Sequence, residues 1–407
     1  MKAGKPKNLK VNNRKLVLEL FRKNEILTAA EISKAIDISK TTVMKILDFL
    51  SLSGLILIAG KGDSTGEGGK KPVLFKLNER FALAAGVHIL PDRIDIVVSD
   101  LFSKPLYSGT VKLDDNESLE RVTGLIALSL EKIIKKNKIS KKSILGIGIA
   151  IPGIVDSTKG VVCLSPRFPS WGTQAEFVKL ISEKTNNVIP VYIDNECRFK
   201  VYAEKKSGVA KDRKNIIAVE AGYGLVAGIM INNEIIRGVH NLAGEIGHMV
   251  IAPESQAVCV CGGSGCFEVM VSVERLIETA KALKSESPDS LIFKYNDNHE
   301  LNIERIFIAA GAGDQLAIKL MEGIIKWFAI GLSNLIVMCD PEIIVLQGIY
   351  TKAGESFLNA LKKRINELVL VKINKKVEIR CSQFEGKAAI TGAVSYVVDE
   401  TFYNYIF

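Results

Sequence analysis

Hydrophobic residues recur with a helical period in the first fifty residues of the chain. A helix over residues 12–24 would carry on one face the apolar side chains Leu16, Val17, Leu20 and Phe21. Thr28 and Glu31 have the spacing of a capping box, which predicts the start of a second, shorter helix. Ser39 can cap a third helix, whose buried stripe would be Val43, Ile46, Leu47 and Leu50. The pattern therefore predicts three short helices in succession.

The third helix has a polar and basic leading end, and two apolar strands follow it. Its opposite face carries Lys40, Thr41, Thr42 and Lys45. The strands over 55–58 and 73–77 flank a loop over 60–72 that is rich in glycine and lysine. This order is typical of a winged helix-turn-helix, which reads base edges through its third helix and contacts phosphates through the wing. We expect base contacts from the third helix and phosphate contacts from the wing lysines Lys70 and Lys71. A dimerisation module of the same shape is the alternative.

From residue 81 onwards the chain alternates between predicted strands and helices. The apolar runs predict strands over 84–98, 144–151, 188–193, 216–220 and 343–346. The helical periods predict helices over 117–137, 173–186, 196–207, 314–336 and 352–367. Such alternation favours an α/β body with mixed sheets. We therefore divide the chain into a DNA-binding domain over 1–79 and a larger domain over 80–407.

Composition and charge narrow the class of protein. With 47% hydrophobic and 24% charged residues, the chain of 407 residues is expected to fold, and disorder is excluded. No apolar run follows the first lysines, and the most apolar stretch, 328–339, is too short for a membrane span, so we expect a cytoplasmic protein. Residues 1–80 hold 16 Lys and Arg against 8 Asp and Glu, which accounts for +8 of the net charge of +9. A basic head on a nearly neutral body favours binding to a polyanion, although a solvated lysine-rich segment gives the same count.

Three of the seven cysteines lie within eight residues, downstream of a histidine. The histidine is His248, and the cysteines are Cys259, Cys261 and Cys266 in a glycine-rich run. One imidazole and three thiolates form a closed tetrahedral set that suits zinc in a structural role. Three thiols without metal are the alternative.

Several motifs together resemble the ROK family of repressors, open reading frames and sugar kinases, and in particular its xylose- and N-acetylglucosamine-type repressors. They are Ile-Pro-Gly-Ile-Val-Asp at 151–156, Ala-Gly-Glu-Ile-Gly-His at 243–248, the cysteine run at 259–268, and Gly-Gly-Lys-Lys-Pro at 68–72. The resemblance covers nearly the whole chain. It implies an actin-like, ribonuclease H-like body of two lobes with a ligand cleft between them.

The resemblance also implies which residues face a sugar. Glu245, His248 and Glu268 would contact its hydroxyls, and Pro152 with Gly153 would shape one wall of the cleft. The start of the helix at 196–207 would add Asn195 and Glu196. Carboxylates accept hydrogen bonds from vicinal hydroxyls, and a zinc-bound imidazole has its second nitrogen free for a hydroxyl. Taken singly, Glu245 and Glu268 would be ordinary surface carboxylates.

The turns that hold ATP phosphates in the family's kinases are altered in this chain. Where the first turn should have Asp and Gly, the sequence has His88 and Leu90, and the following Pro91 has no N–H to give. The second turn contains Tyr223 in place of Thr, and the third has Gln347 before Gly348. Glu196 replaces the aspartate base, and its longer side chain displaces the carboxylate. We therefore expect a sugar sensor and not an enzyme, the main alternative being an ATP-dependent sugar kinase with a DNA-binding appendage.

Two arginines stand where the family's kinases have asparagine. They are Arg167 and Arg198. If both guanidinium groups point into the cleft, the effector is anionic, such as a sugar phosphate; otherwise they point outward or pair with nearby acids. We expect a homodimer or dimer of dimers that represses carbohydrate-utilisation genes and leaves its operator when the effector binds. A regulator switched by a protein partner, with a vestigial sugar pocket, is the third hypothesis.

Overall fold

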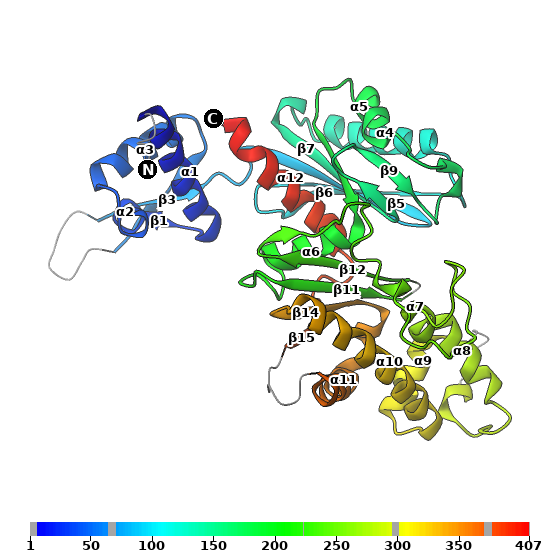
Figure 1. Cartoon of the computed structure of the whole chain (residues 1–407). Coiled ribbons are helices and arrows are strands. Elements are labelled where there is room, and N and C mark those ends of the chain that lie inside the picture. The colour runs from blue at the N-terminus through cyan, green and yellow to red at the C-terminus, as the bar shows by residue number, and fades with distance from the viewer. Residues whose placement is uncertain (1–5, 64–70, 223, 295–300, 370–376, 407) are drawn as a thin grey trace.

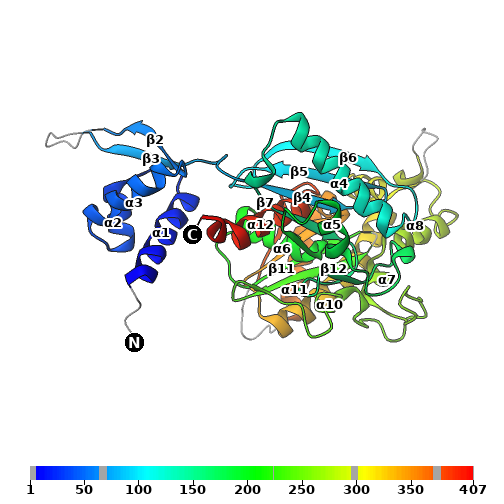
Figure 2. The same cartoon turned by 90° about the horizontal axis from the view of Figure 1, so that it is seen from above.

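The computed structural model describes residues 6–63, 71–222, 224–294, 301–369 and 377–406. A small N-terminal unit lies beside a larger body that contains two sheets, and the last helix of the chain ends next to the small unit (Figures 1 and 2). Both views place the head at one end of the molecule. The body is therefore joined to the head by the chain after β3 (Val73–Leu77) and by the contacts of the C-terminal helix.

Over residues 6–63 and 71–79, the head has three helices and a three-stranded antiparallel sheet, in the order of a winged helix-turn-helix. Its elements are α1 (Pro6–Lys23), β1 (Leu27–Thr28), α2 (Ala29–Ile36), α3 (Lys40–Leu52), β2 (Ile56–Lys61) and β3 (Val73–Leu77). The sheet order is β1-β3-β2. The predicted capping box at Thr28 and Glu31 is confirmed, and Ser39 Oγ accepts the N–H of Thr42 at the start of α3.

The predicted buried face of α1 is wrong at one position. Leu16 is 43% exposed, whereas Leu18 is fully buried beside Val17 and Phe21. These three side chains belong to one buried cluster that also contains residues of α12 (Ala388–Ile406), namely Val394, Val397, Val398 and Phe402. The face of α1 is thus set partly by a helix almost 400 residues away in the sequence, which no local period can reveal.

The body contains two five-stranded sheets with the same topology. The first has the order β10 (Val191–Asn195), β7 (Ile144–Ile151), β4 (Leu83–Ile89), β5 (Arg93–Ser99) and β6 (Pro105–Lys112). The second has the order β13 (Glu234–Ile235), β12 (Leu225–Ile231), β11 (Ile216–Ala221), β14 (Ile343–Gly348) and β15 (Glu378–Cys381). In each sheet the first three strands in sequence are antiparallel and the next two are parallel. The repeat confirms the predicted two-lobed, ribonuclease H-like architecture; we call the sheets and their helices lobe 1 and lobe 2.

Two strand predictions need correction. The predicted strand over 84–98 is a hairpin of β4 and β5, because Pro91 and Asp92 turn the chain and the N–H of Leu90 donates to the carbonyl of Arg93. The strand predicted over 188–193 begins only at Val191, after Pro190. A small antiparallel hairpin of β8 (Ile154–Asp156) and β9 (Val161–Leu164) follows β7.

Helices cover both sheets. In lobe 1, α4 (Leu119–Lys136) and α5 (Phe177–Lys184) lie on the outer side, and in lobe 2 the outer helices are α10 (Gln315–Cys339) and α11 (Gly354–Leu368) (Figure 1). Lobe 2 also contains α7 (Phe267–Val271), α8 (Val273–Ala282) and α9 (Ile303–Gly311). Short 3-10 turns occupy Lys141–Ser143, Pro169–Trp171, Ile246–His248, Leu291–Phe293 and Ile349–Ala353.

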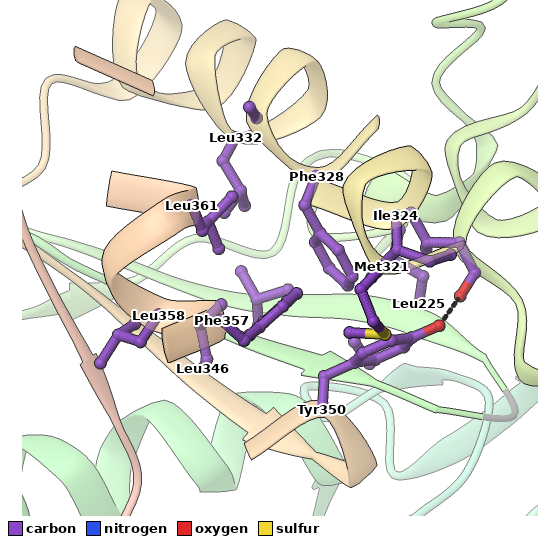
Figure 3. Packing of buried hydrophobic residues seen from close by; sticks show 14 of the residues in the cluster. Leu225, Met321, Ile324, Phe328, Leu332, Leu346, Tyr350, Phe357, Leu358 and Leu361 are labelled. Carbon is purple, nitrogen blue, oxygen red and sulfur yellow. Dashed lines mark hydrogen bonds between the residues drawn. The ribbon is translucent and has the colours of Figure 1, made fainter. Parts of the chain in front are cut away.

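Helix α10 forms much of the core of lobe 2. Figure 3 shows Met321, Ile324, Phe328 and Leu332 pointing from α10 towards α11 and the sheet, and Tyr350 Oη donates to the carbonyl of Val271 at 2.6 Å. Among the described residues, α10 is the one helix long and apolar enough to cross a membrane, but 56% of its most apolar window is buried inside the protein. The prediction of a buried helix over 314–336 is confirmed, and the helix ends three residues later, at Cys339.

Helices α6 (Glu196–Ser207) and α12 lie between the two sheets and touch each other through their backbones. A Cβ added to Gly392 of α12 would lie 1.8 Å from the carbonyl oxygen of Phe199 in α6. A Cβ on Gly148 of β7 would lie 2.5 Å from the carbonyl oxygen of Ala393, and one on Gly228 of β12 would lie 2.0 Å from that of Cys197. The order of packing is therefore lobe 1, α12, α6 and lobe 2. At each of the three boundaries a glycine lets the two backbones touch without a side chain between them.

We expect Gly392→Ala to destabilise the protein by about 1–3 kcal/mol, because the new methyl group must displace backbone. Gly323→Ala in α10 is the matched control, since that helical glycine is exposed and has no atom within 4 Å of its added Cβ. The control should gain about 0.4–1 kcal/mol from the smaller entropy of the unfolded chain. Urea unfolding of both variants measures the difference, and an equal midpoint for the two would refute the close packing of α6 on α12.

Candidate functional site

The four residues predicted to bind metal lie together. The ligand atoms of His248, Cys259, Cys261 and Cys266 all lie within 4.8 Å of one another. Cys259 Sγ is 3.6 Å from His248 Nδ1, and the sulfurs of Cys261 and Cys266 are 3.7 Å apart. One nitrogen and three sulfurs at this spacing suit a tetrahedral zinc site. Because His248 turns Nδ1 towards the thiols, its Nε2 is left for another partner.

The loop that carries the cysteines is closed by backbone contacts. Gly265 has a φ of +68°, and a Cβ there would lie 2.0 Å from the carbonyl oxygen of Ala252. The N–H of Cys259 donates to the carbonyl of Gly263 at 2.7 Å. Glycine is needed at 265 for both the backbone conformation and the close approach. Cys266 then stands directly before α7, whose first turn carries Glu268.

Glu245 and Glu268 lie near His248, and their contact with a sugar stays a prediction. Glu268 Oε2 accepts the N–H of Leu225 at 2.8 Å, which fixes this carboxylate at the start of β12. Burial raises the pKa of Glu245, the neighbouring His248 and Arg198 act in the opposite direction, and Glu268 raises it further. The three groups are thus close enough to influence one another, and together they offer several acceptors to a polyhydroxyl ligand.

Asn195 joins the two lobe 1 segments predicted to contact a sugar. Its Oδ1 accepts the N–H of Cys197 at 2.8 Å and so caps α6, while its Nδ2 donates to the carbonyl of Gly153 at 2.8 Å. Gly153 has a φ of +136°, and Ser165 Oγ donates to the carbonyl of Pro152 at 2.7 Å. The amide of Asn195 therefore retains one N–H and one lone pair for a ligand.

Glu196 belongs to a charged group that crosses from lobe 1 to lobe 2. His88 Nε2 of β4 lies 2.8 Å from its Oε2, and the ammonium of Lys200, one turn along α6, lies 3.7 Å from its Oε1. Lys200 also lies 3.1 Å from Oε2 of Glu220 in β11. Burial alone would raise the pKa of Glu196, but Lys200 and His88 outweigh it and lower the pKa to about 2.

Sequence analysis missed Lys200 and Glu220. Lys200 is four residues after Glu196, a spacing that brings side chains together on a helix, so this pair had a local signal. Glu220 has no such signal, because only the packing of α6 on the second sheet brings it near.

The anion hypothesis is wrong for Arg198. This residue is 3% exposed, and its guanidinium donates to Asp194 Oδ1 at 2.8 Å and to the carbonyls of Val155 and Asn241. Arg237, which follows β13 in lobe 2, donates to the other oxygen of Asp194 at 2.7 Å. The alternative, in which arginine pairs with a nearby acid, therefore holds. Arg167 is exposed, and its role as a ligand contact stays a prediction.

The predicted DNA-binding residues lie on the outside of the head wherever they are described. Lys40, Thr41 and Lys45 are exposed along α3, and Lys71 is exposed before β3. Thr42 is half-buried, with its Oγ1 2.8 Å from the Oγ of Ser39. Lys70 and Tyr223 lie outside the described residues.

Comparison with known proteins gives four informative likenesses. A family model described as the ROK family matches residues 85–400. The xylose repressor of Caldicellulosiruptor bescii is 30% identical over 392 residues, which is 96% of each chain, whereas the glucokinase of Halalkalibacterium halodurans is 29% identical over 67% of this chain and 81% of its own. The crystal structure of a ROK family transcriptional regulator, a homologue of the E. coli MLC protein, superposes with a TM-score of 0.81 at 22% identity and covers 98% of both chains.

We expect Asp194→Asn to cost about 3–5 kcal/mol of stability, because two arginines would lose a buried anionic partner. Glu367→Gln is the matched control, since it removes the carboxylate from the ion pair with Arg364. Both side chains of that pair are nearly half exposed. Exposed pairs of that kind contribute about 0–1 kcal/mol. Thermal unfolding of both variants distinguishes them, and similar melting temperatures would show that the two arginines do not depend on Asp194.

Proposed function

Because the chain belongs to the ROK family, we propose that it is a transcriptional repressor of carbohydrate-utilisation genes that binds a sugar without phosphorylating it. The observation that carries this proposal is the match to a named repressor over 96% of the chain, head included. Residues 1–79 would bind the operator, and residues 80–407 would bind the effector. We place the protein in the cytoplasm, where both ligands are found.

The head supplies the groups that DNA binding needs. Residues 1–80 contribute +8 of the net charge of +9, and the exposed face of α3 offers Lys40, Thr41 and Lys45 to the major groove. Lys71, with Lys70 beside it in the sequence, would contact phosphates from the wing. A homodimer, or a dimer of dimers, would place two copies of α3 in successive major grooves about 34 Å apart.

The effector that the site favours is a neutral sugar. Glu196, Glu245 and Glu268 are acceptors for hydroxyl hydrogens, and these three carboxylates would repel a phosphate. Arg198 and Arg237 are already held by Asp194 and are not free to attract one. The repressor named above points to D-xylose as the first sugar to test. Arg167 is the remaining contact predicted for an anionic group.

The residues around Glu196 argue against phosphoryl transfer. A general base works best with a pKa near the operating pH, and the pKa of Glu196 is about 2. The turn after β4 offers no free N–H to a phosphate at its first two residues, because the Leu90 N–H is bonded to Arg93 and Pro91 has none. A ROK sugar kinase with a DNA-binding head is the second candidate, since glucokinases are among the relatives.

The imidazole and three thiols would hold a zinc ion with a structural role. The set provides four ligands and therefore leaves no open position for a reacting molecule. When bound, the ion would cross-link the cysteine loop to His248 and would take no part in a reaction. His248 would then be held with Nε2 directed away from the metal, where it can contact a sugar hydroxyl.

The proposed function predicts that the purified protein selects a duplex from a random DNA pool and that D-xylose weakens this binding. Glucose 6-phosphate should have little effect, and neither sugar should cause consumption of ATP. Electrophoretic mobility shift and a coupled ATP assay measure the two properties. ATP turnover that depends on a sugar would favour the kinase instead.

Two lysine variants check the DNA interface in the same assay. Lys71→Gln should weaken binding to all sequences and reduce the slope of log K against log salt by about one, whereas Lys45→Gln should relax sequence preference. Lys363→Gln, an exposed lysine of α11, is the control and should change neither property.

The metal assignment predicts one zinc ion per chain by atomic emission. Cys266→Ser should lose the metal and lower the melting temperature, and a chelator should do the same to the wild type, because ligand binding to the folded state stabilises it. Cys381→Ser removes a half-buried cysteine far from the cluster in the sequence and should keep its zinc. Full metal content in Cys266→Ser would refute the assignment.

A further inference from the structure

Three helices from different parts of the chain meet at one carboxylate, Asp399 of α12. Arg22 in the last turn of α1 lies 2.6 Å from its Oδ1, and Lys206 and Tyr202 of α6 both contact its Oδ2. The side chain of Asp399 is 15% exposed. In both views the end of α12 lies beside α1, where the head meets the body (Figures 1 and 2). We call these four residues the Asp399 junction.

The carboxylate of Asp399 is ionised although it is largely shielded from water. Burial would raise the pKa of Asp399, but Arg22 and Lys206 outweigh it and keep the pKa below its ordinary value. The carboxylate therefore stays charged at neutral pH. A charge that is partly removed from water depends on its partners, so loss of one partner changes the position of the others.

The same helix that reaches the junction also begins at the sugar site. Glu196 is the first residue of α6, and Tyr202 and Lys206 are six and ten residues further on, about 9 and 15 Å along the helix axis. One end of α6 therefore touches the candidate ligand site, and the other touches the head through Asp399.

Helix α6 is too tightly packed to move independently of its neighbours. Its backbone touches β12 at Gly228 and α12 at Gly392, where no side chain separates the elements. The ring of Tyr396 in α12 makes edge contacts with Phe199 and Tyr202 of α6 at centroid distances of 5.6 and 5.5 Å. A displacement at the start of α6 must accordingly be taken up by α12 or by the junction.

We propose that the Asp399 junction couples the sugar site to the DNA-binding head. Without effector, Arg22 holds α1 against α12 and fixes the orientation of α3. Effector binding at the start of α6 shifts Tyr202, Lys206 and Asp399 together relative to Arg22, which weakens the pair with Arg22 and releases the head from the orientation that fits the operator. This inference rests on the proposed function and adds to it the residues through which the signal passes.

The test compares Arg22→Gln, Asp399→Asn and Tyr202→Phe with the control Lys23→Gln. Lys23 is the exposed neighbour of Arg22, so the control also removes one positive charge from the last turn of α1. The DNA is the duplex selected by the wild type, and the sugar is D-xylose. Coupling between two sites typically changes affinity by about 5- to 150-fold. We expect D-xylose to lower DNA affinity by a factor in that range for the wild type and Lys23→Gln. For Arg22→Gln and Asp399→Asn the DNA affinity should change by less than about twofold.

Two further readouts separate coupling from binding and folding. D-xylose affinity without DNA should be no weaker than that of the wild type in any variant, because the junction does not touch the sugar site and a missing pair no longer opposes effector binding. The double variant Arg22→Gln with Asp399→Asn should lose no more coupling than either single one, since both remove the same pair. Should both single variants fail to fold, Tyr202→Phe removes one hydroxyl only and should still reduce the coupling.

The outcomes distinguish this inference from the proposed function. A wild type that selects no duplex, or that ignores D-xylose and other sugars, overturns the proposed function. The junction alone is overturned if D-xylose weakens DNA binding by the wild type and does so equally for Arg22→Gln, Asp399→Asn and Lys23→Gln. Amide hydrogen exchange in the last turn of α1 needs no sugar and should be at least tenfold faster in Arg22→Gln than in Lys23→Gln. Equal exchange in these two variants also overturns the junction.

Discussion

The packing of α6 between the two sheets is the constraint on which the rest of the body depends. Three glycines, at 148, 228 and 392, let backbone meet backbone across the layers, so the layers lie closer than side chains would allow. Interiors packed at this density have few adjustable gaps and transmit displacement. The first turn of α6 is consequently packed against both lobes, and a displacement of this turn is passed on to the elements that touch it. Asn195, Glu196 and Arg198 all belong to that turn or precede it directly, and each uses this position to join segments that are far apart in the sequence.

The same contacts bear on the proposal that a scaffold shared with kinases serves here as a sensor. The carboxylates around His248 offer hydrogen bonds to hydroxyl groups, and nothing in that chemistry requires a phosphate donor. In this chain Glu196 is paired with His88 and Lys200, and Lys200 is paired in turn with Glu220. A group held by two partners with a pKa near 2 remains a good acceptor for a hydrogen bond but a poor base. Both parts of the proposed function, sugar binding and the absence of phosphoryl transfer, thus rest on the same set of contacts.

Local patterns were enough for part of this structure. The capping box at Thr28, the cap at Ser39 and the cysteine spacing were recoverable because each is set by residues close together in the sequence. The carboxylates Glu245 and Glu268 were identified through their motifs, and the structure brings them together. The failures at Leu18 and Glu220 have one physical origin, because each depends on elements from elsewhere in the chain, whereas Lys200 and the partner of Arg198 lie four residues from their counterparts and had a local signal. Helix α12 itself was missed, although it joins the head, lobe 1 and α6.

The junction between head and body combines two kinds of interaction with different consequences. Residues of α1 and α12 belong to one apolar cluster, but hydrophobic contact is non-directional and would tolerate some rotation of the head. The pair between Arg22 and Asp399 is directional, because a guanidinium and a carboxylate must keep their atoms at hydrogen-bond distance. A head held by apolar contact alone would stay attached without a defined orientation. Adding one charged contact at the edge of that cluster defines the orientation, and a change in one charged contact can alter it without detaching the head.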